Sequence, residues 1–182
     1  MTRLYLARHG ENRANIEGVL SHRVVDHPLT DRGRRQAAAL ADWLAQGDIS
    51  AIYSSPLKRA LETATVVSQR LDVPVVTREG LREVNVGSLD GRGDEEAWKI
   101  YHSVVGRWRR GDPAARFPGG EDYREAQERL TAVLDEASAG SPAGGVAVIS
   151  HGEILTQVLA RLVALPAGTE PVLDKAAVIV VD

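Results

Sequence analysis

Two histidines follow short apolar runs, one in each half of the chain. His9 comes directly after the run at 4–7, within the sequence Arg-His-Gly-Glu, and His151 follows the run at 145–150 and begins a second His-Gly-Glu. Short apolar runs of this kind predict β-strands, and in open α/β sheets ligands bind at the carboxyl ends of the strands. We therefore expect the two imidazoles to share one pocket.

An imidazole beside an arginine is suited to phosphate chemistry. Arg8 precedes His9, and a neutral imidazole can attack phosphorus while planar guanidinium donors hold the equatorial oxygens. A zinc site is poorly supported, because neither histidine has a His-x-x-x-His spacing and the chain has no cysteine. We expect no metal and no cofactor. Taken alone, His151 would be read as a core histidine at the end of a strand.

Two further charged residues could take part in this chemistry. Arg59 falls in the first turn of a helix predicted after Pro56. A cation there opposes the helix dipole, so a bound anion would account for it, although a solvated surface arginine accounts for the spacing equally well. Glu83 lies between apolar neighbours. A carboxyl partly removed from water holds a proton more readily, which suits a general acid, but by pattern alone a surface glutamate is the better reading.

Strands and helices must alternate to position these residues. Helices are expected from Thr30 to Gly47, from 56 to 71, and over 94–110, 121–139 and 154–165, and strands over 4–7, 49–54, 73–77, 145–150 and 176–181. This alternation predicts an α/β fold, a three-layer α/β/α sandwich with a mostly parallel central sheet. The final strand is the one that could run antiparallel. The polar segment 12–27 should form an irregular mouth around the pocket.

Composition indicates one soluble globular domain over residues 1–182, with 43% hydrophobic and 26% charged residues. The net charge of -3 argues against a nucleic-acid partner, and no apolar run is long enough for a membrane span. The absence of cysteine and of an apolar leader favours a cytoplasmic protein. A homodimer remains open. We interpret Arg107, Arg109 and Arg110 as a solvated helix end.

Four segments, in order along the chain, resemble the histidine phosphatase superfamily in its phosphoglycerate-mutase-like branch. They are Arg-His-Gly-Glu at 8–11 with Asn15, Ser-Ser-Pro-Leu-Lys-Arg-Ala at 54–60, Glu83 ahead of Gly87 and Gly91, and Ser-His-Gly at 150–152. The resemblance runs from the first strand to past His151 and implies the phosphoglycerate-mutase-like sandwich.

The resemblance also implies a role for each residue. His9 would be the nucleophile that is transiently phosphorylated, and Glu83 would protonate the departing oxygen and later take a proton from water. The expected phosphoryl-binding residues are Arg8, Asn15, Arg59 and His151, and the pocket is expected to be completed by Ser21, His22 and Arg23. We expect neighbouring arginines to lower the pKa of His9 and a bound phosphate to raise that of His151.

The residues around the acid distinguish two activities. Phosphoglycerate mutases of this family have an arginine, a tyrosine and a lysine where this chain has Val84, Val86 and, approximately, Asp94. We therefore predict a phosphatase acting on a small phosphorylated metabolite such as a sugar phosphate, nucleotide or cofactor precursor. A mutase-like phosphotransferase and a phosphate-binding domain without catalysis are the alternatives. Asn12 replaces the usual Thr or Ser, and Asp90 stands where glutamate is commoner.

Overall fold

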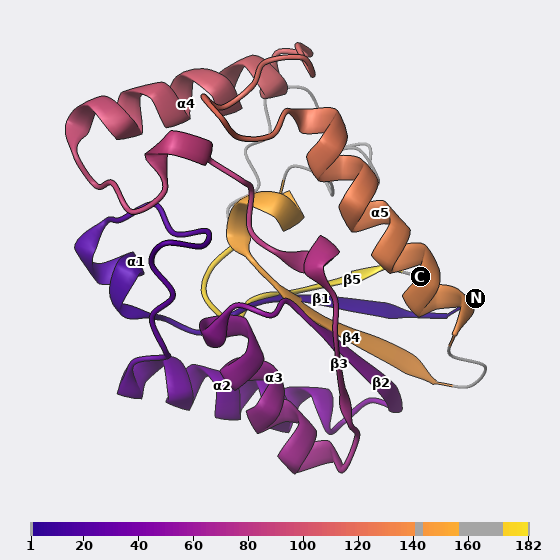
Figure 1. Ribbon diagram of the computed structural model, residues 1–182. Helices are drawn as coiled ribbons and strands as arrows, with labels where there is room; N and C mark the ends of the chain where they lie inside the picture. The colour runs from indigo at the N-terminus through magenta and orange to yellow at the C-terminus, as the bar shows by residue number, and fades with distance from the viewer. Residues whose placement is uncertain (1, 141–143, 157–172, 182) are drawn as a thin grey trace.

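The computed structural model describes residues 2–140, 144–156 and 173–181, and its centre is a five-stranded sheet (Figure 1). The strands are β1 (Leu4–Arg8), β2 (Ile49–Ser54), β3 (Val75–Thr77), β4 (Gly145–Ser150) and β5 (Val178–Val181), in the spatial order β3-β2-β4-β1-β5. The first four strands pair in parallel, whereas β5 runs antiparallel to β1. The predicted α/β architecture is confirmed, including the divergent last strand.

Helices cover both faces of this sheet (Figure 1). They are α1 (Arg13–Glu17), α2 (Asp31–Leu44), α3 (Lys58–Leu71), α4 (Glu95–Arg109) and α5 (Tyr123–Ala139), with short 3-10 turns η1 (Glu79–Leu81) and η2 (Gly87–Leu89). Residues 152–156 are also helical, and the rest of the helix expected over 154–165 lies outside the described residues. Among the described residues, no helix has both the length and the apolar character that crossing a membrane requires.

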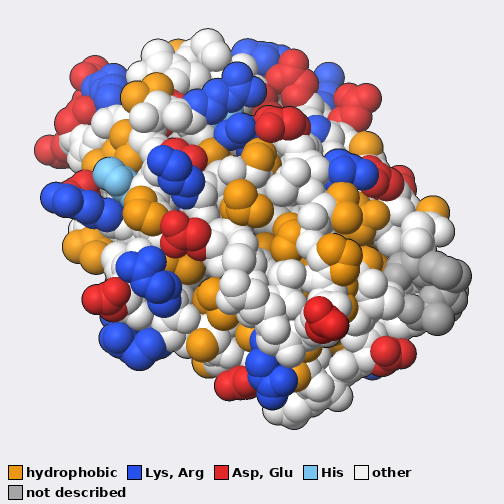
Figure 2. Space-filling view, turned by 60° about the horizontal axis from the view of Figure 1, so that its bottom comes forward, with side chains coloured by type: hydrophobic (Ala, Val, Ile, Leu, Met, Phe, Trp, Pro, Cys, Tyr) orange, Lys and Arg blue, Asp and Glu red, His pale blue; other side chains and the backbone are white. Residues whose placement is uncertain are grey.

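Alternation along the strands sends neighbouring side chains to two separate cores. Leu6 and Val148 belong to the core under α5, whereas Ala7 and Ile149 belong to the core under α2 and α3. All four side chains are fully buried, as expected for the inner strands of a parallel sheet covered on both faces. On the outer face shown in Figure 2, acidic and basic side chains are interspersed with apolar ones, so this face carries no single basic stripe.

The strand register brings the chemically active positions together. Arg8 on β1 pairs with Ser150 on β4, so His9 and His151 follow at the same edge of the sheet. The backbone N–H of His9 donates to the Ser150 carbonyl at 3.0 Å. On the other side of β4, the N–H of Ser55 donates to the carbonyl of Ile149 at 2.9 Å. The carboxyl ends of β1, β4 and β2 therefore meet at one place, as the sequence predicted.

Local chemistry explains where the elements begin, and where three expectations were wrong. Thr30 caps α2 as predicted, through a 3.0 Å bond from the Gly33 N–H. Residues 13–17 form α1 rather than an irregular loop, because Asn12 and Asn15 make a reciprocal capping box. Leu61, which the helical spacing of the apolar residues after Pro56 predicts to be buried, is 36% exposed. The third strand covers 75–77 and not 73–77.

Candidate active site

His9 has its proton on Nδ1 and a lone pair on Nε2. Its Nδ1 lies 2.6 Å from the carbonyl oxygen of Gly10, and its Nε2 lies 3.1 Å from Nε of Arg59. A carbonyl can only accept a hydrogen bond, so Nδ1 carries the proton, and Nε2 accepts the Arg59 N–H. The ring is 2% exposed. His9 is therefore held in a single tautomer with Nε2 as the nucleophilic atom.

Burial and nearby positive charge keep this imidazole neutral. Burial is the main cause that holds the pKa of His9 well below its ordinary value, followed by the guanidinium of Arg59, with Arg8 contributing. This confirms the predicted direction, although removal from water counts for more than the arginines named from the sequence. A neutral imidazole at physiological pH is the form that can act as a nucleophile.

His151 is the second imidazole of the site and is fully buried. Its ring centroid lies 5.0 Å from that of His9, with the two planes inclined by 62°. Burial, followed by the charge of Arg59, holds the pKa of His151 well below its ordinary value in the free protein. His151 is therefore neutral in the free protein, and the rise of its pKa that we expect from bound phosphate stays a prediction.

Three buried nitrogens around His9 have no hydrogen-bond partner within the described residues. They are Nε of Arg8, Nδ2 of Asn12 and Nδ1 of His151. Leaving a buried donor unsatisfied costs about 1–3 kcal/mol, so the arrangement favours a ligand with several acceptor oxygens. Arg8 and Asn12 line the cavity together with His9. A tetrahedral phosphate is the kind of anion that these groups match.

Backbone contacts fix the two donors at the end of β1 and in the loop that follows. Arg8 Nη1 donates to the Leu173 carbonyl at 2.7 Å, and a Cβ at Gly152 would lie only 2.9 Å from the guanidinium carbon. Asn12 Oδ1 accepts the N–H of Asn15 at 3.1 Å, which leaves the Asn12 amide donors for the cavity. Sequence analysis recorded Asn12 only as a departure from the family pattern and missed this position.

Arg59 is a buried cation rather than the solvated arginine that its spacing also allowed. Its side chain is 3% exposed and lies in the first turn of α3. Nη1 donates to Ser21 Oγ at 3.1 Å and Nη2 to the Ser21 carbonyl at 2.8 Å. Asp26 lies at 4.0 Å from Nη1. The guanidinium is therefore fixed in place before any ligand arrives.

Glu83 is held beside the two histidines by backbone donors. Its Oε1 accepts the N–H groups of Val84 and Ile154, both at 2.9 Å, and Oε2 accepts the N–H of Glu153 at 3.3 Å. Two of these donors belong to the helical turn that follows His151, where a carboxylate is electrostatically favoured. Glu83 lines the cavity, so the alternative of a surface glutamate is wrong.

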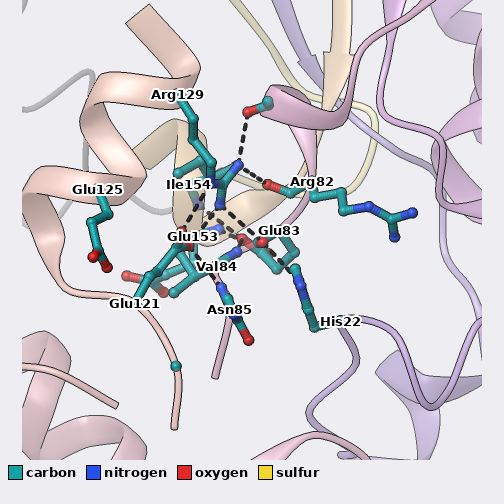
Figure 3. Close-up of polar contacts among 12 residues, drawn as sticks. His22, Arg82, Glu83, Val84, Asn85, Glu121, Glu125, Arg129, Glu153 and Ile154 are labelled. Carbon is teal, nitrogen blue, oxygen red and sulfur yellow. Dashed lines mark hydrogen bonds and ion pairs between the residues drawn. The ribbon is translucent and has the colours of Figure 1, made fainter. Parts of the chain in front are cut away.

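Arg129 on α5 binds the backbone of residues 80–83, which we call the acid segment (Figure 3). Its Nη1 donates to the carbonyls of Gly80 and Arg82 at 2.7 and 2.8 Å, and its Nη2 donates to that of Glu83 at 3.1 Å. Glu121 receives two bonds from the same guanidinium at 2.9 and 2.7 Å. Sequence analysis missed both residues, because no local pattern reveals a side chain that binds carbonyls 46 or more positions away.

Two of the loop residues predicted to bind substrate line the cavity. Ser21 reaches it beside Arg59, and Asn15 reaches it from α1. The Oδ1 atom of Asn15 accepts the N–H of Asn12 at 3.2 Å, which leaves Nδ2 of Asn15 as the atom that can donate to a ligand. The capping box therefore also orients a cavity side chain.

The other two loop residues lie outside the cavity lining, so their predicted contact with substrate is revised. His22 is buried, and its Nδ1 lies 3.0 Å from the Glu83 carbonyl. Arg23 is exposed. The backbone N–H groups of His22 and Arg23 donate to the Asp90 carboxylate at 2.8 and 2.7 Å. These residues shape the loop instead of reaching the ligand.

The cavity has a volume of about 250 Å³ and a mixed polar and apolar lining. Besides the residues above, it is lined by Val19, Leu20, Val84, Val86, Trp98, Tyr101, Arg109, Gly152, Glu153, Thr156 and Leu173. The Tyr101 hydroxyl donates to Glu153 at 2.7 Å, and Arg109 lies 3.9 Å from the same carboxylate. Arg109 is therefore part of the cavity and not only a solvated helix end. The described residues contain no group of three His, Asp or Glu placed to hold a metal ion.

Comparison with known proteins places this chain in a family. The chain is 34% identical over 176 residues to "Probable phosphoglycerate mutase GpmB" of Proteus mirabilis (strain HI4320), covering 93% of this chain and 79% of that protein. It is similar in structure to mycobacterial glucosyl-3-phosphoglycerate phosphatase, with a TM-score of 0.80 and 26% identity over 98% of this chain and 89% of that one. Its likeness to the alpha-ribazole phosphatase from Shigella flexneri has a TM-score of 0.80 and 27% identity, covering 100% and 90% of the two chains. The sequence model of the histidine phosphatase superfamily (branch 1) matches residues 4–182, and the chain belongs to this superfamily.

Proposed function

We propose that this protein is a phosphatase that hydrolyses a small phosphomonoester through a phosphohistidine on His9. The observation that carries the proposal is the unprotonated Nε2 of His9, which accepts the Arg59 N–H at 3.1 Å and lies near three buried nitrogens, on Arg8, Asn12 and His151, that have no partner within the described residues. A phosphoryl group satisfies these donors together and brings its phosphorus to the nucleophile. In this proposal, residues 1–182 form one catalytic domain.

In the first step, the Arg59 N–H that Nε2 of His9 accepts turns to a phosphoryl oxygen, the freed Nε2 lone pair attacks phosphorus, and the bond from phosphorus to the ester oxygen breaks. The phosphoryl group passes through a transition state whose negative charge is spread over three equatorial oxygens, which the guanidinium groups of Arg8 and Arg59 stabilise. Glu83 enters this step protonated and gives that proton to the departing alkoxide, becoming the carboxylate that its three backbone donors stabilise. Because protein contacts hold both guanidinium groups in place, the reorganisation is confined to the Arg59 Nε–H, which leaves His9 Nε2 for a phosphoryl oxygen.

In the second step, a water molecule attacks the phosphorus of phospho-His9 while Glu83 takes one of its protons. The bond from phosphorus to nitrogen breaks, inorganic phosphate leaves, and the lone pair returns to Nε2. We assign the proton transfer to Oε2 of Glu83, because its 3.3 Å bond to the Glu153 N–H is the longest of the three that the carboxylate accepts.

The apolar residues of the cavity lining support hydrolysis of an ester with an uncharged, partly apolar alcohol. Val84 and Val86 belong to this lining and give no charge to bind a substrate carboxylate. Tyr101 and Arg109 are both engaged by Glu153. Because Tyr101 and Arg109 are paired with Glu153, we expect them to hold an alcohol product weakly, so that the product leaves and water meets phospho-His9. The names of similar proteins include both phosphatases and a mutase, and this lining favours the phosphatase.

The test is phosphate release from p-nitrophenyl phosphate and a panel of phosphorylated metabolites, with and without EDTA. We expect turnover without added metal, a phosphohistidine trapped by alkaline quenching, and loss of both in His9→Ala. His27→Ala, another histidine outside the cavity, is the matched control and should retain activity. Phosphate release that persists in His9→Ala and disappears with EDTA would contradict the proposal. Transfer of label to a second position on the product would indicate a mutase instead.

A further inference from the structure

Ser55 is a fully buried hydroxyl that touches the second histidine of the site. It lies in the turn between β2 and α3, where its backbone N–H bonds to the carbonyl of Ile149. Its Oγ accepts the N–H of Leu57 at 3.3 Å and lies 2.7 Å from Nε2 of His151. The mechanism above does not use this residue.

The count of protons decides which atom donates in this contact. A serine hydroxyl has one proton, and within the described residues the acceptor that it reaches is Nε2 of His151. If that proton is donated, the proton of a neutral His151 must be on Nδ1. In the opposite arrangement Nε2–H would donate to Ser55, which would leave both the hydroxyl proton and Nδ1 buried without a partner. The first arrangement is favoured, because it leaves only one group unsatisfied.

We propose that Ser55 is a positioning residue that holds neutral His151 in the Nδ1–H tautomer, so that Nδ1 donates a hydrogen bond to the transferring phosphoryl group. The inference rests on the proposed function for its ligand. It is supported by the burial of Nδ1 without a partner and by the 5.0 Å separation of the two imidazole rings.

The charged surroundings of His151 fit a neutral donor better than a cation. Arg59, His9, Arg129 and Arg8 all disfavour a second proton on its ring, after the larger effect of burial. These arginines already provide positive charge at the site, whereas a directed N–H adds a hydrogen bond without further repulsion. His9 and His151 then have the same protonated nitrogen but opposite tasks, since one offers Nε2 to phosphorus and the other offers Nδ1–H to an oxygen.

The first measurement is the protonation of His151 in the free protein, read from the ring nitrogens by 15N NMR of histidine-labelled protein. The signal is assigned by its loss in His151→Gln. We expect the proton on Nδ1 in the wild type and a shift of the population towards Nε2–H in Ser55→Ala. Ser55→Thr, which keeps the hydroxyl, should restore the wild-type tautomer. Ser54→Ala, which removes the neighbouring buried hydroxyl, is the matched control and should leave it unchanged.

The second measurement is turnover. We expect kcat of Ser55→Ala to fall about 10-fold to 100-fold with little change in KM, by analogy with the loss of one transition-state donor. Ser55→Thr should lie within about threefold of the wild type. Inorganic phosphate should shift the Nδ1 signal of the wild-type protein. A wild-type His151 protonated on Nε2, a Ser55→Ala protein with unchanged tautomer and kcat, or an Nδ1 signal that ignores phosphate would each overturn the inference. A wild type that binds phosphate at Nδ1 but hydrolyses no ester would instead overturn the proposed function.

Discussion

Removing the Arg129 side chain should lower both the free energy of unfolding and the kcat that depends on Glu83. The guanidinium makes two charge-assisted bonds to Glu121 and three bonds to main-chain carbonyls of the acid segment. The Glu121 side chain is 10% exposed and that of Arg129 is 23% exposed, so Arg129→Ala leaves a nearly buried carboxylate without its partner. Breaking such a pair costs about 3–5 kcal/mol. Because Arg129 retains some contact with water, we expect the lower end, about 3 kcal/mol.

Urea unfolding of the wild type, Arg129→Ala and Arg124→Ala measures this loss. Arg124 lies on the same helix and is exposed, so its substitution should change the free energy of unfolding by less than about 0.5 kcal/mol. A loss of 3 kcal/mol corresponds to a decrease in Tm of roughly 6–12 °C for a chain of this size. The kcat for an alkyl phosphate should also fall, by about 10-fold, because the Glu83 carbonyl loses one of its anchors.

A double-mutant cycle then separates the ion pair from the carbonyl bonds. If the pair dominates, Glu121→Ala and Arg129→Ala together should destabilise the protein by clearly less than the sum of the single losses, with a coupling of about 1–3 kcal/mol. Additive losses would show that the two side chains act independently. An Arg129→Ala protein that loses less than about 1 kcal/mol and keeps its kcat would refute the reasoning as a whole.

Four further outcomes follow from the site. Glu83→Gln should slow an alkyl phosphate about 100-fold but p-nitrophenyl phosphate far less, since only the poor leaving group needs the proton; equal losses would count against the acid role. Folding lowers the pKa of His9 and His151, so the unfolded chain binds more protons than the folded protein below about pH 6.5. The free energy of unfolding should therefore fall as the pH drops from about 6.5, by up to about 1.4 kcal/mol per pH unit for each imidazole. Urea unfolding in phosphate-free buffer at a series of pH values should show a free energy of unfolding that depends less steeply on pH in the double variant His9→Asn, His151→Asn. An unchanged pH dependence would contradict this. Val84→Arg should raise kcat/KM for 3-phosphoglycerate relative to a neutral alkyl phosphate by about 10-fold. A constant ratio of the two kcat/KM values would argue that Val84 does not select against a substrate carboxylate. Asn12→Ala should weaken inhibition by vanadate about 10-fold through loss of a bond to a charged ligand, whereas Asn12→Ser keeps a donor and a cap and should stay nearer the wild type.

Sequence reasoning located the parts of the site that depend on where strands end. His9 and His151 follow apolar runs, and parallel strands place their carboxyl ends at one edge, so their proximity could be predicted without coordinates. Arg59 could be placed in the first turn of α3, but its burial could not, because that depends on the Ser21 loop folding over it. A motif specifies the residue types at a site more reliably than it specifies which surfaces close around them.

The residues that escaped prediction act through long-range contacts with the main chain. Arg129 binds carbonyls of a segment near position 82, and nothing in the amphipathic pattern of α5 distinguishes it from a solvated arginine. His22 was expected to touch substrate, but its ring bonds to the Glu83 carbonyl. The capping box that forms α1 was overlooked because asparagine replaces the usual glutamate or glutamine at its second position.

The two histidines show why a motif alone could not assign their roles. Both follow a parallel strand, both precede Gly-Glu, and both are buried imidazoles with lowered pKa. They differ in the atom that each ring meets. A carbonyl, which cannot donate, meets Nδ1 of His9 and leaves the lone pair on Nε2, where it accepts the Arg59 N–H until a phosphoryl group binds. A hydroxyl, which can donate, meets Nε2 of His151 and leaves Nδ1 for the ligand. The role of His151 as donor, as distinct from that of His9 as nucleophile, therefore depends on Ser55, a residue contributed by a third segment of the chain.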